Sequence, residues 1–477
     1  MTPSGGWTVV VACLAVACTP AVTPQTREAY TRLRVEPAEC VAPGPEIVSP
    51  TAMQADWARL EEILRRGYAG YTVVADEATW AQAFEDGAAA LPDAPISAVD
   101  YRDFLVEHLR FADDNHFGFW VRGPDGARLW RSTSAHRFAH LSDALFEQRG
   151  RDWIDPDGRV LVGCRDQVRP TWDDGAISHR LIVLSADPLA SVDCEVLDGD
   201  EEVSATYALT PRARDLDAGP AFEQRPGQVP WLRVRTLGMA RRDALERFVA
   251  SAARVRESRV VILDVRGNGG GSDRFLLSWF ASLTDQDLRY FDTLRVSSEV
   301  ELQGALTFWT CQAGLSRGDD AGSAWMRARI DQASRSLDDA MHHRGPYVDR
   351  IEGSYTEPGR APSRFRGRLV LVTDRGCGSA CETSVLLARQ IPGTLVVGEN
   401  TEGTMKVGEL RHYRLPETGV WVSVGRRAHR DRALGGFPEG RGYLPDVWLD
   451  GDDVEGDLAE IAACLTEPGC ERLAPRD

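Results

Sequence analysis

The chain has 477 residues, of which 43% are hydrophobic and 27% are charged. This composition is typical of globular proteins, and it excludes a chain that is mainly disordered, collagenous or coiled coil. The length is enough for about two or three domains. Acidic residues outnumber basic ones by 72 to 55, which gives a net charge of −17. Because nucleic-acid binding needs a basic surface, we do not expect nucleic acid as a partner.

The first 50 residues are typical of an exported protein. An apolar run at residues 7–17 is too short to span a bilayer and ends just before Cys18. The preceding Ala-Val-Ala resembles a bacterial lipoprotein cleavage box, so we expect a signal at residues 1–18 and consider a lipid on Cys18 that would attach the chain to a membrane. Residues 19–50, rich in Pro, Thr and Glu, are predicted to be a tether. The expected location is the periplasm, the outer membrane through a lipid anchor, or the medium.

Eight cysteines follow the predicted signal, an even number that favours disulfides in an exported chain. Cys464 and Cys470 are close enough in sequence to be partners, but spacing alone assigns no pairing. The spacings lack a paired C-x-x-C pattern, so no metal site is expected. These cysteines are Cys40, Cys164, Cys194, Cys311, Cys377, Cys381, Cys464 and Cys470.

The middle of the chain divides by its hydrophobic pattern. Residues 51–150 begin with apolar residues at helical spacing and are predicted to form a mainly helical subdomain, with a short strand near residues 118–121. Residues 158–225 carry short β-like runs between turn residues and predict a small β-rich region. We find no convincing carboxylate-binding loop of a PDZ domain there, so recognition of substrate C-termini is not implied.

Residues 229–450 alternate between buried-strand runs and helical patterns, which predicts an α/β core with largely parallel strands. Residues 312–345 are predicted to be a polar helical insertion, and residues 451–477 a C-terminal tail. The strands are expected at Trp231–Val234, Val260–Val265, Leu369–Thr373 and Leu395–Val397, and the helices at Asp243–Val255, from Arg274, and at Ala380–Gln390.

Chemistry is concentrated in loops that follow these strands. The segment DRGCGSACE places Ser379 at the start of a helix, where free amides favour negative charge. The alternative is a capping box, in which Ser379 caps the helix and Glu382 occupies the third position. Another strand is followed by RGNGGG, whose glycines allow amides to approach a substrate closely. Two further loops, GENTEG and EGRGYLPD, are ordinary when taken alone.

Together and in this order, the four segments resemble the S41 family of serine peptidases, which includes the tail-specific processing proteases and the tricorn core protease. The resemblance covers roughly residues 229–450. It implies a crossover-type (ClpP/crotonase-like) α/β core. It also implies that Ser379 is the nucleophile and that the amides of Ala380 and Gly270 form the oxyanion hole. Such donors contribute about 3–4 kcal/mol each where charge develops.

The base differs between branches of the family. The processing proteases carry a lysine directly after the Thr-x-Gly turn, where this chain has Thr404; Lys406, the only lysine of the chain, lies two residues further on. The tricorn-like branch uses histidine, and the segment DNHFG around His116 resembles its histidine segment, while Glu439 matches its glutamate.

We therefore expect a Ser379–His116–Glu439 triad, with neutral imidazole as the base. The open alternatives are Lys406 as base, His412 or His429 in place of His116, Asp114 or Asn115 as the group that orients His116, and a reactive Cys381.

The predicted function is that of an exported serine endopeptidase that needs no cofactor and acts on peptides or unfolded proteins. An alternative is a catalytically silent protein on the same fold that binds hydrophobic ligands or peptides, as the retinoid-binding relatives of this family do. The pH profile distinguishes the two bases, because a histidine base loses activity below about pH 6–7.

Overall fold

The computed structural model describes residues 35–173, 175–211, 219–225, 227–315, 320–344, 346–430, 437–449 and 453–466. The predicted signal at 1–18, with Cys18, and much of the predicted tether lie outside these ranges. Cys470 lies outside them as well, whereas its predicted partner Cys464 is disulfide-bonded. No helix within the described ranges is long and apolar enough to cross a membrane.

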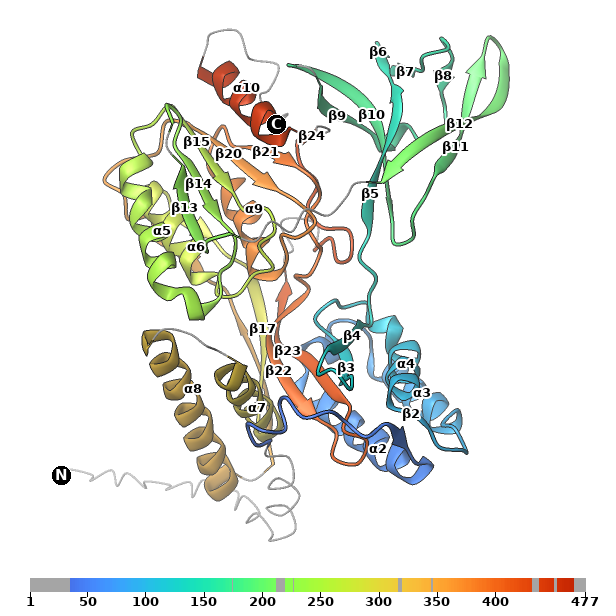
Figure 1. Cartoon of the computed structure of the whole chain (residues 1–477), viewed down its shortest axis with the longest axis vertical. Coiled ribbons are helices and arrows are strands. Elements are labelled where there is room, and N and C mark those ends of the chain that lie inside the picture. Colours follow the sequence, from blue (N-terminus) through green and yellow to red (C-terminus); the bar gives the residue numbers. More distant parts are fainter. Residues whose placement is uncertain are drawn as a thin grey trace, which may run out of the picture.

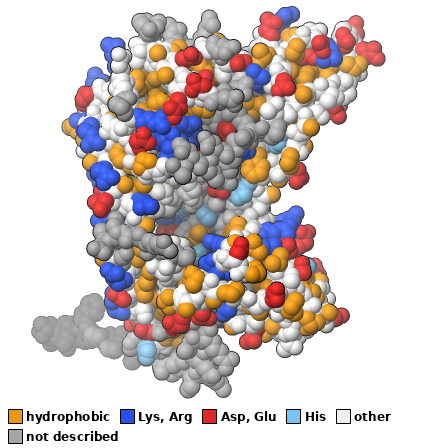
Figure 2. All heavy atoms as spheres, viewed as in Figure 1, with side chains coloured by type: hydrophobic (Ala, Val, Ile, Leu, Met, Phe, Trp, Pro, Cys, Tyr) orange, Lys and Arg blue, Asp and Glu red, His pale blue; other side chains and the backbone are white. Residues whose placement is uncertain are grey.

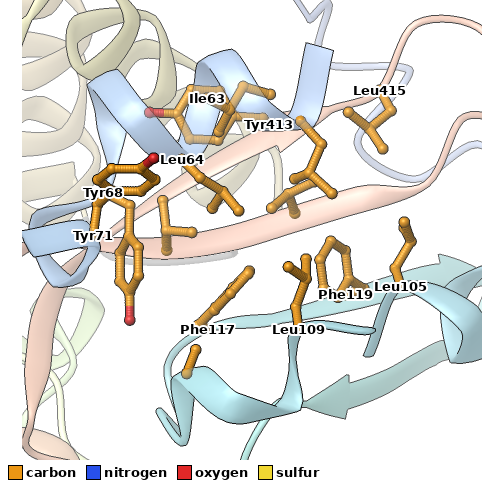
Figure 3. Packing of buried hydrophobic residues seen from close by; sticks show 14 of the residues in the cluster. Ile63, Leu64, Tyr68, Tyr71, Leu105, Leu109, Phe117, Phe119, Tyr413 and Leu415 are labelled. Atoms are coloured by element: carbon orange, nitrogen blue, oxygen red, sulfur yellow. The ribbon is translucent and has the colours of Figure 1, made fainter. Parts of the chain in front are cut away.

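The amino-terminal part begins with three helices. α2 starts where Ser49 accepts a hydrogen bond from the Ala52 amide and Pro50 takes the first helical position. Its apolar face packs with α4 and with strands of the second sheet described below, as Figure 3 shows for Leu64, Phe117 and Tyr413. The elements are β1 (Ile47–Val48), α2 (Pro50–Gly67), α3 (Glu77–Ala89), β2 (Ile96–Ser97) and α4 (Ala98–Leu109).

The short strand predicted near residues 118–121 is confirmed, but the prediction of a mainly helical region over 51–150 is otherwise wrong beyond residue 112. Four strands follow, namely β3 (Gly118–Arg122), β4 (Arg128–Ser132), β5 (Phe138–Leu145) and β6 (Glu147–Arg149). The reason is that β3 is buried on both faces: Phe119 packs into the helical layer, while Trp120 stacks on Trp421 at 5.3 Å.

The central part of the molecule is a parallel sheet, which confirms the α/β class. Its strands β14 (Trp231–Val234), β15 (Val260–Asp264), β20 (Arg368–Thr373), β21 (Leu395–Gly398) and β24 (Val447–Leu449) lie side by side in that order. β13 (Phe222–Arg225), which the sequence assigned to the β-rich region, pairs with the outer edge of β14.

Helices cover both faces of this sheet. Alternate residues of β15, such as Val261 and Leu263, pack against α5 (Arg242–Val255), α6 (Arg274–Leu283) and α9 (Thr383–Ala388). Val260 and Ile262 face α10 (Val454–Thr466) on the other side. Parallel strands covered on both faces explain the continuous apolar runs in the sequence.

The β-rich region extends the same sheet. β9 (Val168–Asp173) pairs in parallel with β24, and the sheet continues through antiparallel strands to β6, fourteen strands in all. The region starts before residue 158, because β5 to β7 belong to it. Its other strands are β7 (Asp152–Ile154), β8 (Val160–Leu161), β10 (Ala176–Ser185), β11 (Ser191–Asp198) and β12 (Glu201–Pro211).

A second, antiparallel sheet joins the two ends of the chain. β23 (Trp421–Arg430) pairs with β3 from the amino-terminal part, with its neighbour β22 (Val407–Arg414), and with β17 (Asp292–Ser298). In Figure 1 this sheet lies below the parallel sheet, beside α2 and α7. β18 (Val348–Gly353) pairs with β17, and the short β16 (Leu288–Arg289) with β19 (Thr356–Glu357).

The helical insertion begins earlier than the predicted residue 312. It consists of α7 (Glu299–Leu315), α8 (Asp320–Asp339) and a π-helical turn at Ala340–Arg344. Buried polar residues such as Glu301 interrupt the apolar pattern of α7, so its start is hidden in the sequence. A disulfide from Cys311 of α7 to Cys40 ties the insertion to the amino-terminal segment.

Candidate active site

The segment around Ser379 makes a sharp turn after β20. Gly378 is extended, Ser379 has the left-handed φ of +53°, and a single 3-10 turn at Ser379–Cys381 leads into α9. A side chain disfavours this conformation by about 1–2 kcal/mol, so its presence here is a feature of functional sites. The turn leaves the Ser379 side chain at a cavity, while Cys377 and Cys381 on either side are fully buried.

The capping-box interpretation of this segment is wrong. Among the described contacts, the Glu382 amide donates to the Ser379 carbonyl at 2.8 Å, and no capping bond to the Ser379 hydroxyl is present. The Glu382 carboxylate instead accepts hydrogen bonds from the hydroxyl of Thr401 (2.6 Å) and from the amides of Gly403 (3.0 Å) and Thr404 (2.7 Å). Burial raises the pKa of Glu382 to about 7, against the opposing effect of these hydrogen bonds. Glu382 therefore fixes the neighbouring loop, and the Ser379 hydroxyl has no capping role.

The glycine-rich loop after β15 lies directly against Ser379. Gly270 has a φ of +94°, and a Cβ there would come within 2.7 Å of the Gly378 carbonyl oxygen and 3.0 Å of the Ala380 nitrogen. Asn268 joins the two loops, because its carbonyl accepts from the Gly378 amide at 3.1 Å. Only glycine permits this close approach of the two backbones.

The predicted oxyanion donors sit at this contact. The Gly270 amide donates to Asn268 Oδ1 at 3.0 Å. The next residue, Gly271, lines the cavity together with Ala380 and Ser379. Among the described residues, neither the Gly271 amide nor the Ala380 amide has a hydrogen-bond acceptor. Two amides are thus available beside the Ser379 side chain.

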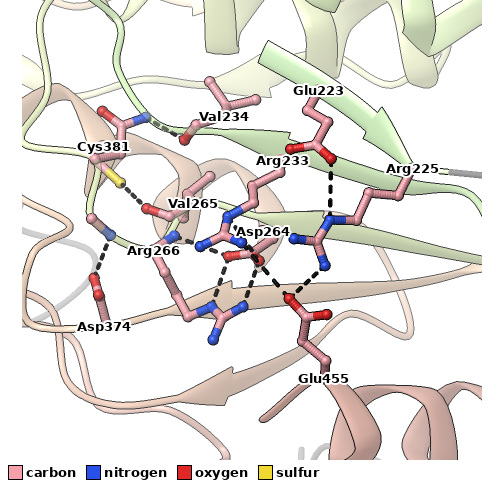
Figure 4. Close-up of polar contacts among 12 residues, drawn as sticks. Glu223, Arg225, Arg233, Val234, Asp264, Val265, Arg266, Asp374, Cys381 and Glu455 are labelled. Atoms are coloured by element: carbon pink, nitrogen blue, oxygen red, sulfur yellow. Dashed lines mark hydrogen bonds and ion pairs between the residues drawn. The ribbon is translucent and has the colours of Figure 1, made fainter. Parts of the chain in front are cut away.

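Charged side chains fix the first residues of the glycine-rich loop and of the nucleophile loop by hydrogen bonds (Figure 4). Asp374 accepts hydrogen bonds from the amides of Gly267 and Gly376, both at 2.9 Å, and so links the glycine-rich loop to the nucleophile loop. Burial raises the pKa of Asp374 to about 6. Asp264, at the end of β15, accepts from the guanidinium of Arg266 at 2.8 Å. These hydrogen bonds therefore hold the starts of the two loops in place.

His116 lies two residues before β3 and lines the same cavity as Ser379. Its Nδ1 lies 2.5 Å from the carbonyl oxygen of Val407. Because a carbonyl only accepts hydrogen bonds, Nδ1 carries the proton, and Nε2 of the neutral ring is left as an acceptor. The His116 amide donates to Asp114 Oδ1 at 2.9 Å. Among the described contacts no hydrogen bond joins Ser379 to an imidazole, and such bonds often tighten only when substrate binds.

Glu439 is half-buried, and among the described contacts it makes no hydrogen bond to the His116 ring. Its Oε1 accepts from the Asn115 amide (2.8 Å), and its Oε2 accepts from the amides of Met405 (3.0 Å) and Lys406 (2.8 Å). Burial, followed by the nearby Asp114 charge, raises the pKa of Glu439, and the three amides oppose that rise. The carboxylate joins the two segments that flank the imidazole.

The alternative bases occupy different surroundings. The Lys406 amine donates to the Asp113 carbonyl at 2.6 Å and does not line the cavity. His412 is buried between Trp120 and Phe308, and this burial holds its pKa well below the ordinary range. His429 does line the cavity, as described next. Cys381 is in a disulfide and is not a free thiol.

His429 is a second imidazole beside Ser379. Its Nδ1 lies 2.6 Å from the Met405 carbonyl, so the proton is again on Nδ1. Burial lowers its pKa to about 3, and its Nε2 is buried without a partner among the described residues. The structure thus brings Ser379, His116 and His429 to one cavity.

The cavity has a volume of about 580 Å³ and lies between the two sheets. Figure 2 shows that this face of the molecule is hollowed near its middle and that histidine side chains gather there. The insertion forms one wall with apolar side chains from α7 and α8: Phe308, Trp309, Trp325 and Met326. The cavity lining also includes Arg411, Arg426 and Arg427, and their charges are matched by Glu301 and Glu409.

Sequence reasoning misses several residues that shape this site. The sequence presents Asn268 only as part of a glycine-rich loop. Its position after Arg-Gly at the end of a strand is a signal that its side-chain amide could hold the loop by hydrogen bonds. It presents Glu382 only as a cap. The aromatic wall of α7 and α8 is hidden as well, because the insertion has a polar composition.

The chain was compared with protein families, with curated proteins and with solved structures. Residues 229–447 match the profile of peptidase family S41. No curated protein matches the chain. Mature CPAF is 14% identical with a TM-score of 0.43, covering 83% of this chain and 92% of that one. The photosystem II D1 C-terminal processing protease is 17% identical with a TM-score of 0.39, covering 88% of this chain and 99% of that one. The tricorn protease is 15% identical with a TM-score of 0.40, covering 88% of this chain and 37% of that one.

The matched segment contains the strands and loops that carry Ser379, the glycine-rich loop and Glu439. With these motifs in the family's order, residues 229–447 match a peptidase domain of family S41, and the protein is a serine-type peptidase.

Proposed function

We propose that the chain is an exported serine endopeptidase in which Ser379 is the nucleophile, His116 the general base and Glu439 a residue that positions His116. The observation that carries this proposal is that Ser379, in its left-handed turn, and His116 line one cavity. A serine hydroxyl is a weak nucleophile unless a nearby base accepts its proton, and neutral imidazole suits this role near pH 7.

The proposed reaction follows from the tautomer of His116. Ser379 Oγ attacks the peptide carbonyl carbon while its proton passes to His116 Nε2, since Nδ1 donates to Val407. The oxyanion accepts hydrogen bonds from the Ala380 amide and from the glycine-rich loop, where Gly271 is favoured over Gly270 because the latter donates to Asn268. The imidazolium then protonates the leaving amine, and water hydrolyses the acyl-enzyme by the same route.

Glu439 acts on the base through the backbone. By binding the amides of Asn115 and Lys406, it fixes both the segment that carries His116 and the segment that carries the Val407 carbonyl. This arrangement does the work that a direct carboxylate–imidazole bond does in other triads.

The proposed substrates are peptides or unfolded protein segments, since the cavity is an open cleft between two sheets. Export is supported by the three described disulfides, because such bonds persist in oxidising compartments. We propose that the protein works in the periplasm, at the outer membrane or outside the cell. A lipid on Cys18 would be revealed by metabolic labelling with a fatty acid, with Cys18→Ala as the control.

The proposal is tested by labelling the signal-free protein with a fluorophosphonate and mapping the adduct by peptide mass. We expect an adduct on Ser379 in the wild type and in Lys406→Ala, and no adduct in His116→Ala. An adduct that depends on Lys406 and not on His116 would contradict the proposed base. No adduct in any protein, together with no cleavage of unfolded proteins, would favour a silent binding protein on the same fold.

A further inference from the structure

Ser379 lies inside a small covalent ring. A disulfide joins Cys377 to Cys381, whose Cα atoms are 5.3 Å apart, so the ring contains only three residues between its cysteines. Both cysteines are fully buried. We propose that this disulfide is a positioning element that holds Ser379 and Ala380 in their catalytic geometry. The inference rests on the proposed function, in which these two residues supply the nucleophile and an oxyanion donor.

The backbone at Ser379 needs such a constraint. The residue has a φ of +53°, a conformation that residues with a side chain disfavour, whereas Gly378 before it is extended. If φ relaxed to a negative value, the Ser379 side chain would swing away from its position at the cavity. The following amide, that of Ala380, would rotate with it. Both catalytic groups therefore depend on one disfavoured dihedral angle.

Hydrogen bonds to other segments anchor both ends of this turn, but among the described residues none of them reaches Ser379 or Ala380 between those ends; after the turn, the Glu382 side chain makes these bonds. Before Ser379, the Gly378 amide donates to the Asn268 carbonyl at 3.1 Å, and the Cys377 carbonyl accepts from the Glu402 amide at 3.0 Å. After Ser379, the amides of Cys381 and Glu382 bond back within the turn itself, to the carbonyls of Gly378 and Ser379. The disulfide is the direct covalent link between these two anchored ends, across Ser379 and Ala380.

The disulfide also touches the strand that carries the second oxyanion donor. Cys381 Sγ lies 3.6 Å from the carbonyl oxygen of Val265, at the end of β15, as Figure 4 shows. The glycine-rich loop starts at the next residue, and Gly270 packs against Gly378 and Ala380. Loss of the disulfide would therefore loosen the contact between the two loops as well as the turn itself.

The other disulfides provide an internal comparison. The sequence separations are 4 for Cys377–Cys381, 30 for Cys164–Cys194 and 271 for Cys40–Cys311. The stabilisation that a disulfide gives by restricting the unfolded chain grows with the length of the closed loop. The ring around Ser379 should thus contribute least to overall stability. The Cys164–Cys194 bond lies in the β-rich region, and neither residue lines the cavity.

The experiment compares two double variants with the wild type after a non-reducing peptide map has verified the pairings. In Cys377→Ala/Cys381→Ala we expect kcat and the rate of fluorophosphonate labelling to fall by at least about tenfold, since small misplacements of reacting groups are costly. KM should stay within about twofold, because substrate binding is not altered. In Cys164→Ala/Cys194→Ala we expect an unchanged kcat and a larger drop in melting temperature.

A second measurement does not depend on whether the first variant folds. The Cys164→Ala/Cys194→Ala protein is partly reduced, its free thiols are trapped by alkylation, and activity is plotted against the fraction of Cys377–Cys381 opened. Activity that falls in proportion supports the proposal, and activity that persists after this bond has opened overturns it. If the wild type itself is not labelled at Ser379, the proposed function fails, and the positioning role fails with it.

Discussion

The backbone amide of Asn115 donates a hydrogen bond of 2.8 Å to Glu439, although 324 residues separate the two in sequence. The other oxygen of the same carboxylate accepts the amides of Met405 and Lys406. One half-buried side chain therefore joins the segment before His116 to the segment that supplies its carbonyl partner. The position of the proposed base depends on a carboxylate that never touches the ring.

The first prediction concerns this carboxylate. Glu439→Gln replaces one acceptor oxygen by an amide donor that faces backbone N–H groups. Since a buried group left without its hydrogen bond costs about 1–3 kcal/mol, we expect the free energy of unfolding to fall by about that amount. We also expect kcat to fall by about 10- to 100-fold, because a displaced base transfers protons poorly. Urea unfolding and steady-state kinetics measure the two effects.

The matched control for Glu439→Gln is Glu195→Gln, at an exposed position in β11. This variant should behave like the wild type in both measurements. A Glu439→Gln protein with normal kcat would show that the position of His116 does not depend on this carboxylate.

The second prediction concerns His429. Its Nε2 is an acceptor without a partner in the described structure and lies at the cavity, so it is suited to receive an N–H group of the substrate. A lost hydrogen bond of this kind is worth about 1 kcal/mol, so His429→Gln should raise KM about three- to tenfold. The rate of fluorophosphonate labelling should change little. Labelling that disappears as completely as in His116→Ala would instead identify His429 as the base.

The third prediction concerns the wall formed by the insertion. The ring centroids of Trp325 and Trp309 are 5.1 Å apart, and the two side chains line the cavity from α8 and α7. Trp325→Ala removes apolar surface that a substrate side chain would cover, a loss of about 1–3 kcal/mol of binding. We expect KM for an unfolded protein to rise about tenfold or more, with labelling of Ser379 retained. Trp153→Ala, in the β-rich region, is the control, and equal effects of the two variants would refute this role of α8.

The fourth prediction concerns stability and pH. Burial raises the pKa of Glu382 to about 7 in the folded protein, from its ordinary value of 4.5. The folded state thus keeps a proton that the unfolded chain releases. Its contribution to stability is complete below about pH 4.5 and is lost as the pH rises through 7. From pH 5 to 8 this loss amounts to about 3 kcal/mol.

Glu382→Gln does not titrate, so its free energy of unfolding should change between pH 5 and 8 by about 3 kcal/mol less than that of the wild type. Urea unfolding of both proteins at the two pH values measures the difference, in which all other titrating groups cancel. Identical pH dependence in the two proteins would show that Glu382 is ionised throughout this range.

The elements that form the parallel sheet are predictable from the sequence. Buried runs such as Val260–Val265 and Leu369–Thr373 are followed by glycine-rich loops, and parallel strands bring such loops to one edge. This edge is where Ser379 meets Gly270 in the structure. The strand pattern alone therefore predicts half of the candidate site.

The rest of the site cannot be predicted from local sequence patterns. α7 buries polar residues such as Glu301 and Gln303 among its apolar ones, so no clear periodicity marks its start. The partner of each cysteine depends on distances in space, and the Cys40–Cys311 bond spans 271 residues. His116 and His429 contact backbone carbonyls. Every residue has a backbone carbonyl, so the sequence does not indicate which one each ring contacts.

The pairing of β3 with β23 has a consequence for the order in which this enzyme is made. His116 is synthesised early, Ser379 later, and β23 and Glu439 later still. Under the proposed mechanism, a nascent chain has no working site until its late strands have closed on its earliest sheet. The family-matched segment 229–447 alone would likewise lack its base. Under the proposed mechanism, the peptidase therefore stays inactive until its chain has been completed and folded.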